Sequence, residues 1–424
     1  MKKNVDKSIK IMVIGLGYVG LPLALELSKY FIVKGFDVNK KRIQELKNNI
    51  DITNEIKIKK NFSTSKINFT YKFLECRTCN IFIITVPTPV DKKNEPDLRN
   101  LYDASDIVAK LLKKDDIVVI ESTVYPGVTE KIIAPIIEKK SGMIAGKDFN
   151  MGYSPERINP GDSKYKITNI KKVVAADNKK TLNKLSKVYK KIIKAGIHKV
   201  SSIKVAEISK AIENAQRDIN IAFVNEVAMI SKAMNISSYE VLKAANTKWN
   251  FLDFKPGLVG GHCIGVDPFY LAKAAKVAGH NPEVILSGRK INDSMPKFIY
   301  KHATKRLKKN SRILILGLTF KENVKDIRNS KSATLAKLFA DNGYDVEVYD
   351  PVADKKQAFL EYGIKLKVPR KKYDCIIVSV SHREYMKMSE RKILELFKNP
   401  SLLINIKNIW NEIKFPNYIS KWSL

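Results

Sequence analysis

One cysteine of the chain stands where packing does not call for a thiol. The stretch PGLVGGHCIGVDP, residues 256–268, places Cys263 in a glycine-rich loop and closes the loop with Asp267, in a chain with only four cysteines. A thiol used for packing would lie in an apolar strand or helix, whereas glycines let a backbone or a ligand approach closely. We interpret Cys263 as a candidate nucleophile, which reacts as the thiolate and needs a cation or a dipole nearby.

Polar residues along an otherwise apolar segment offer such a cation. Residues 201–235 carry apolar side chains at helical spacing with hardly a breaker, which predicts one long buried helix or a pair of helices. The polar positions that fall near one stripe of it are Lys210, Asn214, Arg217, Asp218 and Asn225. Lys210 would lower the pKa of the thiol or hold a developing oxyanion, and Asn214 would donate to the same oxygen. The alternative is a solvated stripe on a half-buried helix.

A carboxylate suited to hydrolysis follows another strand-like run. In YSPERINPGD, residues 153–162, Glu156 is placed to activate a water that cleaves a thioester, with Arg157 beside it. The alternative is an ordinary surface acid.

The N-terminal segment carries a dinucleotide-binding pattern. GLGYVG supplies Gly15, Gly17 and Gly20 between an apolar strand and an apolar helix, and the next strand ends at Asp37. Glycines let the backbone reach a pyrophosphate, the helix N-terminus adds N–H donors, and the aspartate accepts from ribose hydroxyls. Asp37 favours NAD over NADP, although Lys40, Lys41 and Arg42 follow it closely. The alternative is a tight strand–helix turn with no ligand.

Two later strand ends carry threonines that we expect on the nicotinamide side. Thr88 lies in TVPTP (85–89) and Thr123 in ESTVYPG (121–127), and ligands of open α/β sheets bind at such carboxyl ends. Taken alone, both would be ordinary loop threonines. With Cys263, the pattern indicates NAD-dependent oxidation through a thiohemiacetal to an acyl-enzyme, followed by hydrolysis.

The elements that must position these residues repeat along the chain. IKIMVIGLGYVG (9–20) is echoed by SRILILGLTFK (311–321), and two further strand-like runs at each end also correspond. Both ends therefore predict doubly wound parallel sheets of the Rossmann type. The predicted domains are a dinucleotide-binding domain over residues 1–200, a helical middle domain over residues 201–300 and a second Rossmann-like domain over residues 301–424.

Composition bounds the remaining possibilities. The 424 residues are 44% hydrophobic and carry a formal net charge of +34. The lysines are scattered rather than gathered with aromatics, so we expect no nucleic-acid partner, although a polyanion binder is the alternative. No apolar run approaches the ~18 residues of a membrane span, and the apolar core of the N-terminus is too short for a signal peptide, so we expect a cytoplasmic protein without a membrane partner.

The other cysteines suggest packing rather than chemistry. Cys76 and Cys79 form a C-x-x-C without a second pair or a nearby histidine, so we expect no metal there. Cys375 lies in an apolar strand and is expected in the core.

With these segments in order, the chain resembles the UDP-glucose/GDP-mannose dehydrogenase family over essentially its full length. The matching segments are GLGYVG, TVPTP, ESTVYPG, SPE, AEISKAIEN with NE at 225–226, GGHCIGVDP and LGLTFKENVKDIRNS at 316–330. The resemblance implies two successive NAD-dependent hydride removals at C6 of a nucleotide sugar. It also implies that the second Rossmann-like domain binds UDP, that the active site is a cleft between the two sheets, and that the long helix forms a homodimer interface.

The resemblance assigns roles to individual residues. Cys263 is the nucleophile, Lys210 with Asn214 acts as acid/base or oxyanion group, Glu156 and Thr123 handle the water, and Asp267 supports the pair near the thiol. The implied cofactor contacts are Gly15, Gly17, Tyr18, Val19, Gly20, Asp37, Arg42, Thr88, Thr123 and Arg328. The implied substrate contacts are Arg157, Ile158, Lys210, Asn214, Arg217, Gly260, Phe320 and Lys321.

Two positions of the cysteine loop depart from the UDP-glucose members. Those members commonly have a tyrosine before the cysteine and a lysine three residues after it, where this chain has His262 and Val266. The loop and the segment 248–270 are similar to the branch acting on UDP-N-acetylhexosamines, most of all the Vi-antigen-type dehydrogenases. The implied substrate is UDP-N-acetylglucosamine, for surface polysaccharide biosynthesis, with the N-acetylgalactosamine and N-acetylmannosamine epimers open. A non-catalytic nucleotide-sugar binding protein is the competing function.

Overall fold

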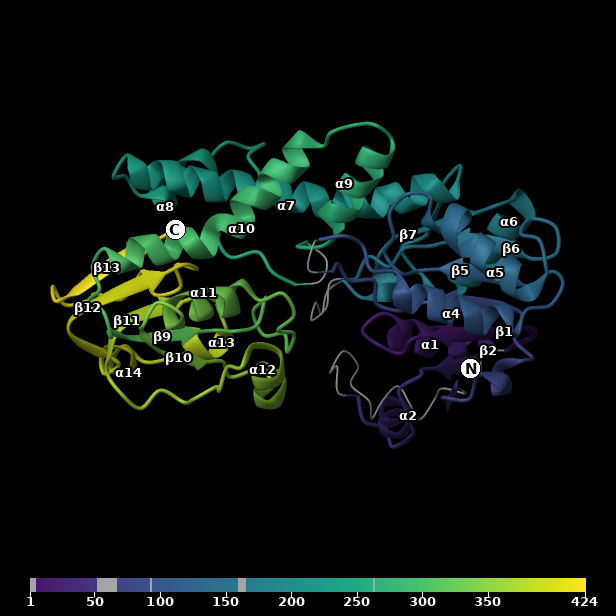
Figure 1. The fold of residues 1–424 in the computed structure, drawn as a ribbon, viewed down its shortest axis with the longest axis horizontal. Coiled ribbons are helices and arrows are strands. Elements are labelled where there is room, and N and C mark those ends of the chain that lie inside the picture. The colour runs from purple at the N-terminus through teal and green to yellow at the C-terminus, as the bar shows by residue number, and fades with distance from the viewer. Residues whose placement is uncertain (1–4, 52–66, 92–93, 159–164, 262–263) are drawn as a thin grey trace. The chain divides into compact units, whose positions relative to one another are not determined.

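Two parallel sheets, each in its own part of the chain, organise the fold. The computed structural model describes residues 5–51, 67–91, 94–158, 165–261 and 264–424. Contacts divide the chain into unit 1, residues 1–213 with 269–280, and unit 2, residues 214–268 with 281–424 (Figure 1).

Unit 1 is built on a sheet with the strand order β3-β2-β1-β4-β5-β6-β7-β8. Neighbouring strands are parallel except β6 and β7. The strands are β1 (Asp6–Ile14), β2 (Phe31–Phe36), β3 (Ile67–Thr70), β4 (Ile81–Ile84), β5 (Ile117–Ile120), β6 (Asn150–Tyr153), β7 (Lys172–Ala176) and β8 (Ile197–Lys199). The order changes direction between β1 and β4, so their carboxyl ends form the switch point at which such sheets bind ligands.

Helices cover both faces of this sheet. They are α1 (Gly20–Ser28), α2 (Lys40–Lys47), α4 (Arg99–Ala109), α5 (Ala134–Ser141) and α6 (Lys179–Ile192), with short helical turns η1 (Phe73–Cys76), η2 (Thr129–Ile133) and η3 (Ile167–Asn169). On one face, Ile11 and Val13 of β1 belong to a core cluster with Leu23 of α1 and Leu185 of α6. Met12 and Ile14 point to the other face and are buried as well. This two-sided burial explains why the strand reads as a continuous apolar run.

Unit 2 carries a second, smaller parallel sheet in the order β10-β9-β11-β12-β13. Its strands are β9 (Arg312–Leu316), β10 (Asp345–Tyr349), β11 (Tyr373–Val378), β12 (Phe397–Asn405) and β13 (Ile419–Ser423). Its helices are α8 (Ser238–Ala245), α10 (Glu283–Thr304), α11 (Lys331–Ala340), α12 (Lys355–Tyr362), α13 (Arg383–Met386) and α14 (Glu390–Leu394). Separate core clusters cover its two faces.

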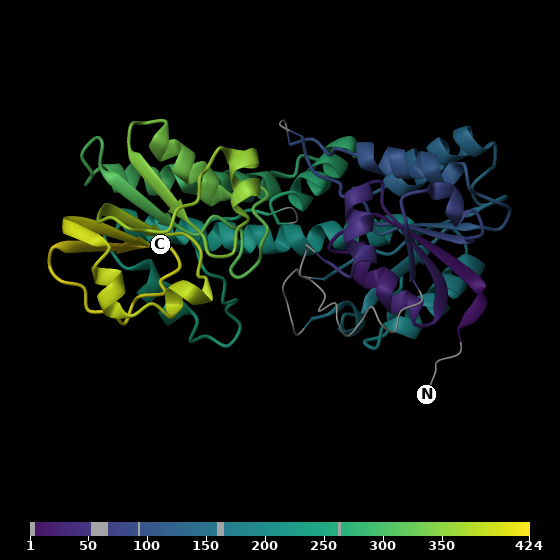
Figure 2. The same cartoon turned by 90° about the horizontal axis from the view of Figure 1, so that it is seen from below.

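Helix α7 (Ile203–Ala233) is one unbroken helix of 31 residues, drawn in teal in Figure 2. The sequence left one helix or a helix pair open, and the structure has the single helix. The boundary between the units falls inside it, after Glu213, and another lies near the start of α9 (Asp267–Val277). The segment predicted as a helical middle domain is therefore shared between the two units.

The predicted repeat is visible in the hydrogen bonds. Gly15 N donates to the Phe36 carbonyl at 2.9 Å in unit 1, and Gly317 N donates to the Tyr349 carbonyl at 2.8 Å in unit 2. Both glycines follow the first strand of their sheet and have positive φ, +89° and +99°. The predicted architecture of two doubly wound sheets with a long helix is confirmed. Among the described residues, no helix is both long and apolar enough to span a membrane.

Candidate active site

The loop between β1 and α1 has the geometry of a dinucleotide-binding turn. Gly15 takes the left-handed conformation, and a Cβ on Gly20 would stand 1.8 Å from the Gly15 carbonyl oxygen, so neither position tolerates a side chain. A Cβ on Gly17 would meet no atom within 4 Å, which leaves open space in front of it. Tyr18 and Val19 lead directly into α1. The backbone can thus approach a pyrophosphate next to a helix N-terminus.

Asp37 follows β2 and keeps acceptor capacity for a ribose. Its Oδ2 accepts from Leu16 N and its Oδ1 from Asn39 N, both at 2.9 Å, and the side chain is half-buried. Arg42 is buried, and its guanidinium donates to the Leu16 carbonyl at 3.0 Å and to Asp51 at 2.8 Å. Arg42 therefore holds the glycine loop in place, and its direct contact with a cofactor stays a prediction.

The two threonines expected near the nicotinamide lie together. Thr88 Oγ1 donates to the Thr123 carbonyl at 2.7 Å, which ties the loops after β4 and β5 to each other. The hydroxyl of Tyr270, on α9, donates to the Thr88 carbonyl at 2.7 Å. Both loops leave the carboxyl ends of their strands, where the sheet binds ligands.

The Thr123 loop is also held from α7. Glu207 accepts from Gly127 N at 2.5 Å and from Thr129 N at 2.9 Å, and it is fully buried. Burial raises the pKa of this carboxyl despite the two backbone donors. The hydrogen bonds cap the start of η2 and fix the turn that follows Thr123.

Glu156 belongs to a buried ionic cluster. One of its oxygens, Oε1, accepts from Arg157 N at 2.7 Å and Ile158 N at 2.9 Å, and Oε2 is 2.9 Å from Lys172 Nζ. Lys172 also pairs with Glu121 at 2.7 Å. Burial lowers the pKa of Lys172, but the two carboxylates outweigh it and raise the pKa, so the ammonium stays charged.

A tyrosine completes this cluster. Tyr189 donates to the second oxygen of Glu121 at 2.5 Å, and the exposed fractions of Glu121, Glu156 and Lys172 are 2%, 7% and 3%. Glu156 is therefore fixed in orientation and paired with a cation, and its work on a water stays a prediction.

Lys210 is the opposite case. It is 7% exposed, and within the described parts of the chain its ammonium has no hydrogen-bond or ion-pair partner. A lysine that is largely buried and has no carboxylate partner in the described chain is typical of a position where a ligand or a reacting group meets the ammonium. It lies one helical turn before Asn214 on α7, as the sequence pattern predicts.

Asn214 and Asp267 are joined by a hydrogen bond, and the supporting role that the resemblance gives Asp267 stays a prediction. The Asn214 amide donates to Asp267 Oδ2 at 2.5 Å, and Asp267 is 2% exposed. Cys263 and His262 lie outside the described residues, so the position of the thiol stays a prediction. The pairing orients the Asn214 amide from the residue that closes the cysteine loop.

The remaining polar positions of α7 face protein or solvent rather than an opening. Asp218 is fully buried and bound by Arg289 at 2.6 Å and by Asn292 at 2.8 Å. Asn225, also fully buried, exchanges two hydrogen bonds with the backbone of Gly257, at 2.8 and 3.1 Å. Arg217 is exposed. The alternative of a wholly solvated stripe is therefore wrong for three of these positions, Lys210, Asp218 and Asn225.

The loop before the cysteine packs against the segment 319–330 of unit 2. A Cβ on Gly260 would stand 2.6 Å from the Asn329 carbonyl oxygen, and one on Gly261 would stand 2.7 Å from the Phe320 ring. Gly261 N donates to the Arg328 carbonyl at 3.2 Å. Gly260 and Phe320, both predicted as substrate contacts, are thus brought together, and there is no room for a side chain at Gly260 or Gly261.

Other predicted contacts already have partners. Arg328 makes a bidentate pair with Asp326, and Arg157 pairs with Glu213 of α7 at 2.7 Å. Lys321 is half-exposed at the turn after Thr319. Whether these side chains bind a ligand stays a prediction.

Three groups near these elements were not singled out from the sequence. Lys172 and Glu121 carry no signal that separates them from the other charged residues of so basic a chain. Lys407 is the third: burial lowers its pKa, and a Cβ on Gly257 would stand 2.5 Å from its Nζ. Gly257 and Lys407 are far apart in the sequence, so no spacing pattern predicts that they lie side by side.

The other cysteines are packing residues. Cys375 is fully buried in β11, as expected. Burial raises the pKa of Cys76 to about 12 and of Cys79 to about 11, which keeps both as unreactive thiols. Within the described residues, no group of histidines, cysteines and carboxylates could hold a metal ion.

The residues present fit a bound NAD. Positive φ at Gly15, open space at Gly17 and spare acceptor capacity at Asp37 match the pyrophosphate and the ribose in turn. Bound there, NAD would supply a hydride acceptor at the carboxyl ends of β4 and β5.

Comparison with protein families gives three consecutive matches along the chain. The UDP-glucose/GDP-mannose dehydrogenase family matches through its NAD binding domain at residues 9–193, its central domain at residues 204–294 and its UDP binding domain at residues 314–412.

Individual relatives match over nearly the whole length. The chain is 46% identical to a UDP-N-acetyl-D-glucosamine 6-dehydrogenase of Pseudomonas aeruginosa, over 96% of this chain and 99% of that protein. It is 48% identical to the protein CapL of Staphylococcus aureus, over 95% and 96%. Among solved structures, a UDP-D-ManNAc dehydrogenase from Pyrococcus horikoshii superposes with a TM-score of 0.84 at 29% identity, over 97% of this chain and 99% of that one.

Proposed function

This chain belongs to the UDP-glucose/GDP-mannose dehydrogenase family and is an NAD-dependent oxidoreductase of nucleotide sugars, and we propose that UDP-N-acetylglucosamine is its substrate. The product is the corresponding UDP-N-acetylhexosaminuronic acid, for use in surface polysaccharide biosynthesis. The relatives named for the glucosamine substrate support this choice, since they are 46% identical, against 29% for the mannosamine enzyme of solved structure.

The observation that carries the catalytic proposal is Lys210, a buried lysine without a partner in the described chain. In the proposed reaction a hydride leaves C6 for NAD while the hydroxyl proton passes to a base, and this gives an aldehyde. The Cys263 thiolate then adds to the aldehyde carbon, and the oxygen takes a proton from Lys210 to form a thiohemiacetal. The ammonium stabilises the negative charge that develops on that oxygen.

The second half of the reaction yields the acid. A second hydride leaves C6 of the thiohemiacetal, its hydroxyl proton returns to Lys210, and a thioester to Cys263 remains. Water activated by Glu156 adds to the thioester carbon, and the thiolate departs with formation of the carboxylate. The sum is one alcohol, two NAD and one water converted to one carboxylate, two NADH and three protons.

The function is tested with a panel of UDP-hexoses and UDP-N-acetylhexosamines, with NADH counted per sugar consumed. We expect two NADH per sugar and the highest kcat/KM with UDP-N-acetylglucosamine. A preference for the galacto or manno epimer would correct the substrate, and no NADH with any member would support a silent nucleotide-sugar binding protein.

The covalent step is tested by Cys263→Ser. Without the thiolate no thioester forms, so we expect acid formation to fall by about 10³-fold or more, while NAD and UDP still bind in calorimetric titrations. Acid production at the wild-type rate would exclude the covalent mechanism.

A further inference from the structure

Asp350 of unit 2 occupies the place that Asp37 has in unit 1. It follows β10 as Asp37 follows β2, and its Oδ2 accepts from Leu318 N at 2.6 Å, as Asp37 accepts from Leu16 N. Its Oδ1 accepts from Val352 N at 2.8 Å, the residue two positions on, as Asp37 accepts from Asn39 N. In a dinucleotide-binding domain this carboxylate receives the ribose.

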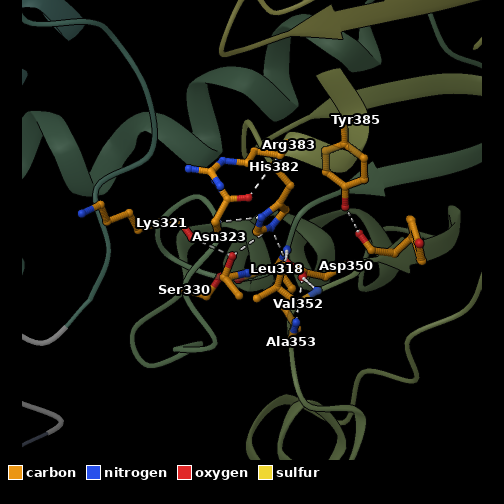
Figure 3. A network of polar contacts seen from close by, with 12 residues as sticks. Leu318, Lys321, Asn323, Ser330, Asp350, Val352, Ala353, His382, Arg383 and Tyr385 are labelled. Carbon is orange, nitrogen blue, oxygen red and sulfur yellow. Dashed lines mark hydrogen bonds and ion pairs between the residues drawn. The ribbon is translucent and has the colours of Figure 1, made fainter. Parts of the chain in front are cut away.

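The carboxylate of Asp350 has no acceptor capacity left for the hydroxyls of a ribose. It also accepts from Thr319 N at 2.9 Å and from Ala353 N at 2.8 Å, and it is only 4% exposed. A further donor, His382 Nε2, lies 3.1 Å from its Oδ2 (Figure 3). This histidine comes from the segment between β11 and α13, is fully buried, and adds one more donor to a carboxylate that four backbone amides already surround.

The contacts of His382 define its tautomer. Asn323 N donates to His382 Nδ1 at 3.0 Å, and because a backbone amide can only donate, Nδ1 is unprotonated and the proton is on Nε2. Nε2 is also 3.1 Å from Thr319 Oγ1, whose own hydrogen goes to the Lys321 carbonyl at 3.0 Å. Asp350 thus favours the neutral imidazole that carries its proton on Nε2, and Nδ1 is left to accept the hydrogen bond from Asn323 N.

These bonds fix both ends of one turn. Thr319 begins it and is held by Asp350, and Asn323 ends it, held by His382 through its amide and by Arg383 N through its side chain at 3.1 Å. Lys321 lies between them, and Figure 3 shows its side chain extending away from the network. In the described chain, no carboxylate pairs with its ammonium.

We propose that His382, oriented by Asp350, is a positioning residue that holds the 319–323 turn so that Lys321 meets the anionic part of the nucleotide sugar. The inference depends on the proposed function through the role of Lys321 as a substrate contact. His382 itself is buried beneath the turn and touches no ligand.

Two substitutions separate the bonds of His382. In His382→Asn the side-chain oxygen replaces Nδ1 as acceptor for Asn323 N, and in His382→Gln the amide nitrogen replaces Nε2 as donor to Asp350 but leaves Asn323 N without a partner. We expect the Kd for UDP, measured by calorimetry without turnover, to rise less than about threefold in His382→Asn and about tenfold or more in His382→Gln. The Kd for NAD stays unchanged in both.

A double-mutant cycle distinguishes positioning from general destabilisation. Lys321→Met should weaken UDP binding, and adding His382→Gln to it should weaken binding no further, since the turn then has no ammonium to place. The control is Tyr385→Phe, which removes a buried hydroxyl bound to the Tyr349 carbonyl at 2.8 Å without touching the turn and should leave the Kd for UDP unchanged. Thr319→Val, which loses the bond to the Lys321 carbonyl, is the second variant should His382→Gln not fold.

The outcomes separate this inference from the function on which it depends. Equal UDP affinity in His382→Gln, Thr319→Val and the wild type, or full additivity with Lys321→Met, would overturn the positioning role alone. A wild-type protein that binds UDP without forming NADH would refute the proposed oxidation and leave the inference standing. A wild type that does not bind UDP would refute both.

Discussion

At the scale of residues, two buried lysines of unit 1 show opposite electrostatics. Lys172 is 3% exposed and has two carboxylate partners, whereas Lys210 is 7% exposed and has none within the described residues. The Lys172 ammonium is held by its two carboxylates as one buried ionic group, whereas the Lys210 ammonium has no carboxylate to hold it. We expect Lys172 to support the fold and Lys210 to take part in the proposed reaction.

We expect Lys210→Met and Lys172→Met to shift stability in opposite directions. Lys210→Met removes an ammonium that has no carboxylate partner in the described chain, so it should raise the free energy of unfolding by on the order of 1 kcal/mol and lower kcat about 10²–10³-fold. Lys172→Met leaves two carboxylates buried without a cation and should cost about 3–5 kcal/mol. Calorimetric unfolding of both variants, with steady-state kinetics of the first, makes the comparison. A destabilised Lys210→Met protein would mean that its ammonium is paired.

A second prediction at this scale concerns the acid stability of unit 2. Burial opposes ionisation of Asp350, but hydrogen bonds from His382 and from the Thr319 and Leu318 amides outweigh it and hold its pKa below the 3.8 of the free side chain. The folded pKa is the lower one, so the stabilisation is complete above pH 4 and is lost as the pH falls toward 2.

Tryptophan fluorescence can follow this loss in unit 2 alone. All three tryptophans, Trp249, Trp410 and Trp422, belong to that unit. In urea titrations, the stability gap between the wild type and Asp350→Asn should narrow from pH 5 to pH 3. A constant gap over this range would contradict the low pKa.

At the scale of elements, α7 does more than present polar residues. Glu207 fixes the turn after Thr123, and Asn225 pairs with Gly257 at the start of the loop that leads to Cys263. One helix therefore holds two loops, and the predicted catalytic residues depend on both.

We expect Asn225→Ala to destabilise unit 2 and slow the reaction. It leaves the buried amide and carbonyl of Gly257 unpaired, at a cost of about 2–3 kcal/mol, and loosening of the loop should lower kcat about tenfold. The matched control is Asn220→Ala on the same helix, because the Asn220 amide nitrogen has no partner in the described chain and little is lost with it. Equal effects of the two substitutions on stability and kcat would refute the role of the Asn225–Gly257 hydrogen bonds in holding the loop.

The sequence predicted elements better than contacts. The glycine loop, Asp37, Asn214 and the long helix have local signals in spacing and periodicity, and the resemblance added the role of Asp267. Asn225 was found as a polar position, but not its partner Gly257, which lies 32 residues away. Lys172 and His382 had no signal, because their meaning depends on which carboxylates the fold brings beside them.

At the scale of the whole molecule, α7 exposes an apolar stripe. Its exposed large apolar residues fall on one face, with offsets of three, four, eleven and seven residues: Val205, Ile208, Ile212, Phe223 and Ile230. Their exposed fractions run from 39% to 56%. A stripe of this kind marks a binding surface, and we propose that a second copy of the chain covers it in a two-fold dimer.

This assembly predicts a molar mass in solution of twice 48.1 kDa. Phe223→Lys, at 56% exposure, places a charge in the stripe and should give the monomer in sedimentation equilibrium. The control is Leu360→Lys, which replaces an apolar residue of 72% exposure by a lysine on α12, outside the stripe, and should leave the dimer intact. A monomeric wild type, or dimers of both variants, would exclude this interface.

Because the acceptor sites of the Asp350 carboxylate in unit 2 are occupied, the number of adenosine ligands that one chain can bind is limited. The chain contains the dinucleotide-binding architecture twice, yet Asp350 offers no acceptor to an adenosine, since five donors already surround it. We therefore expect inhibitors built on adenosine to saturate at one equivalent per chain, with the ribose at Asp37.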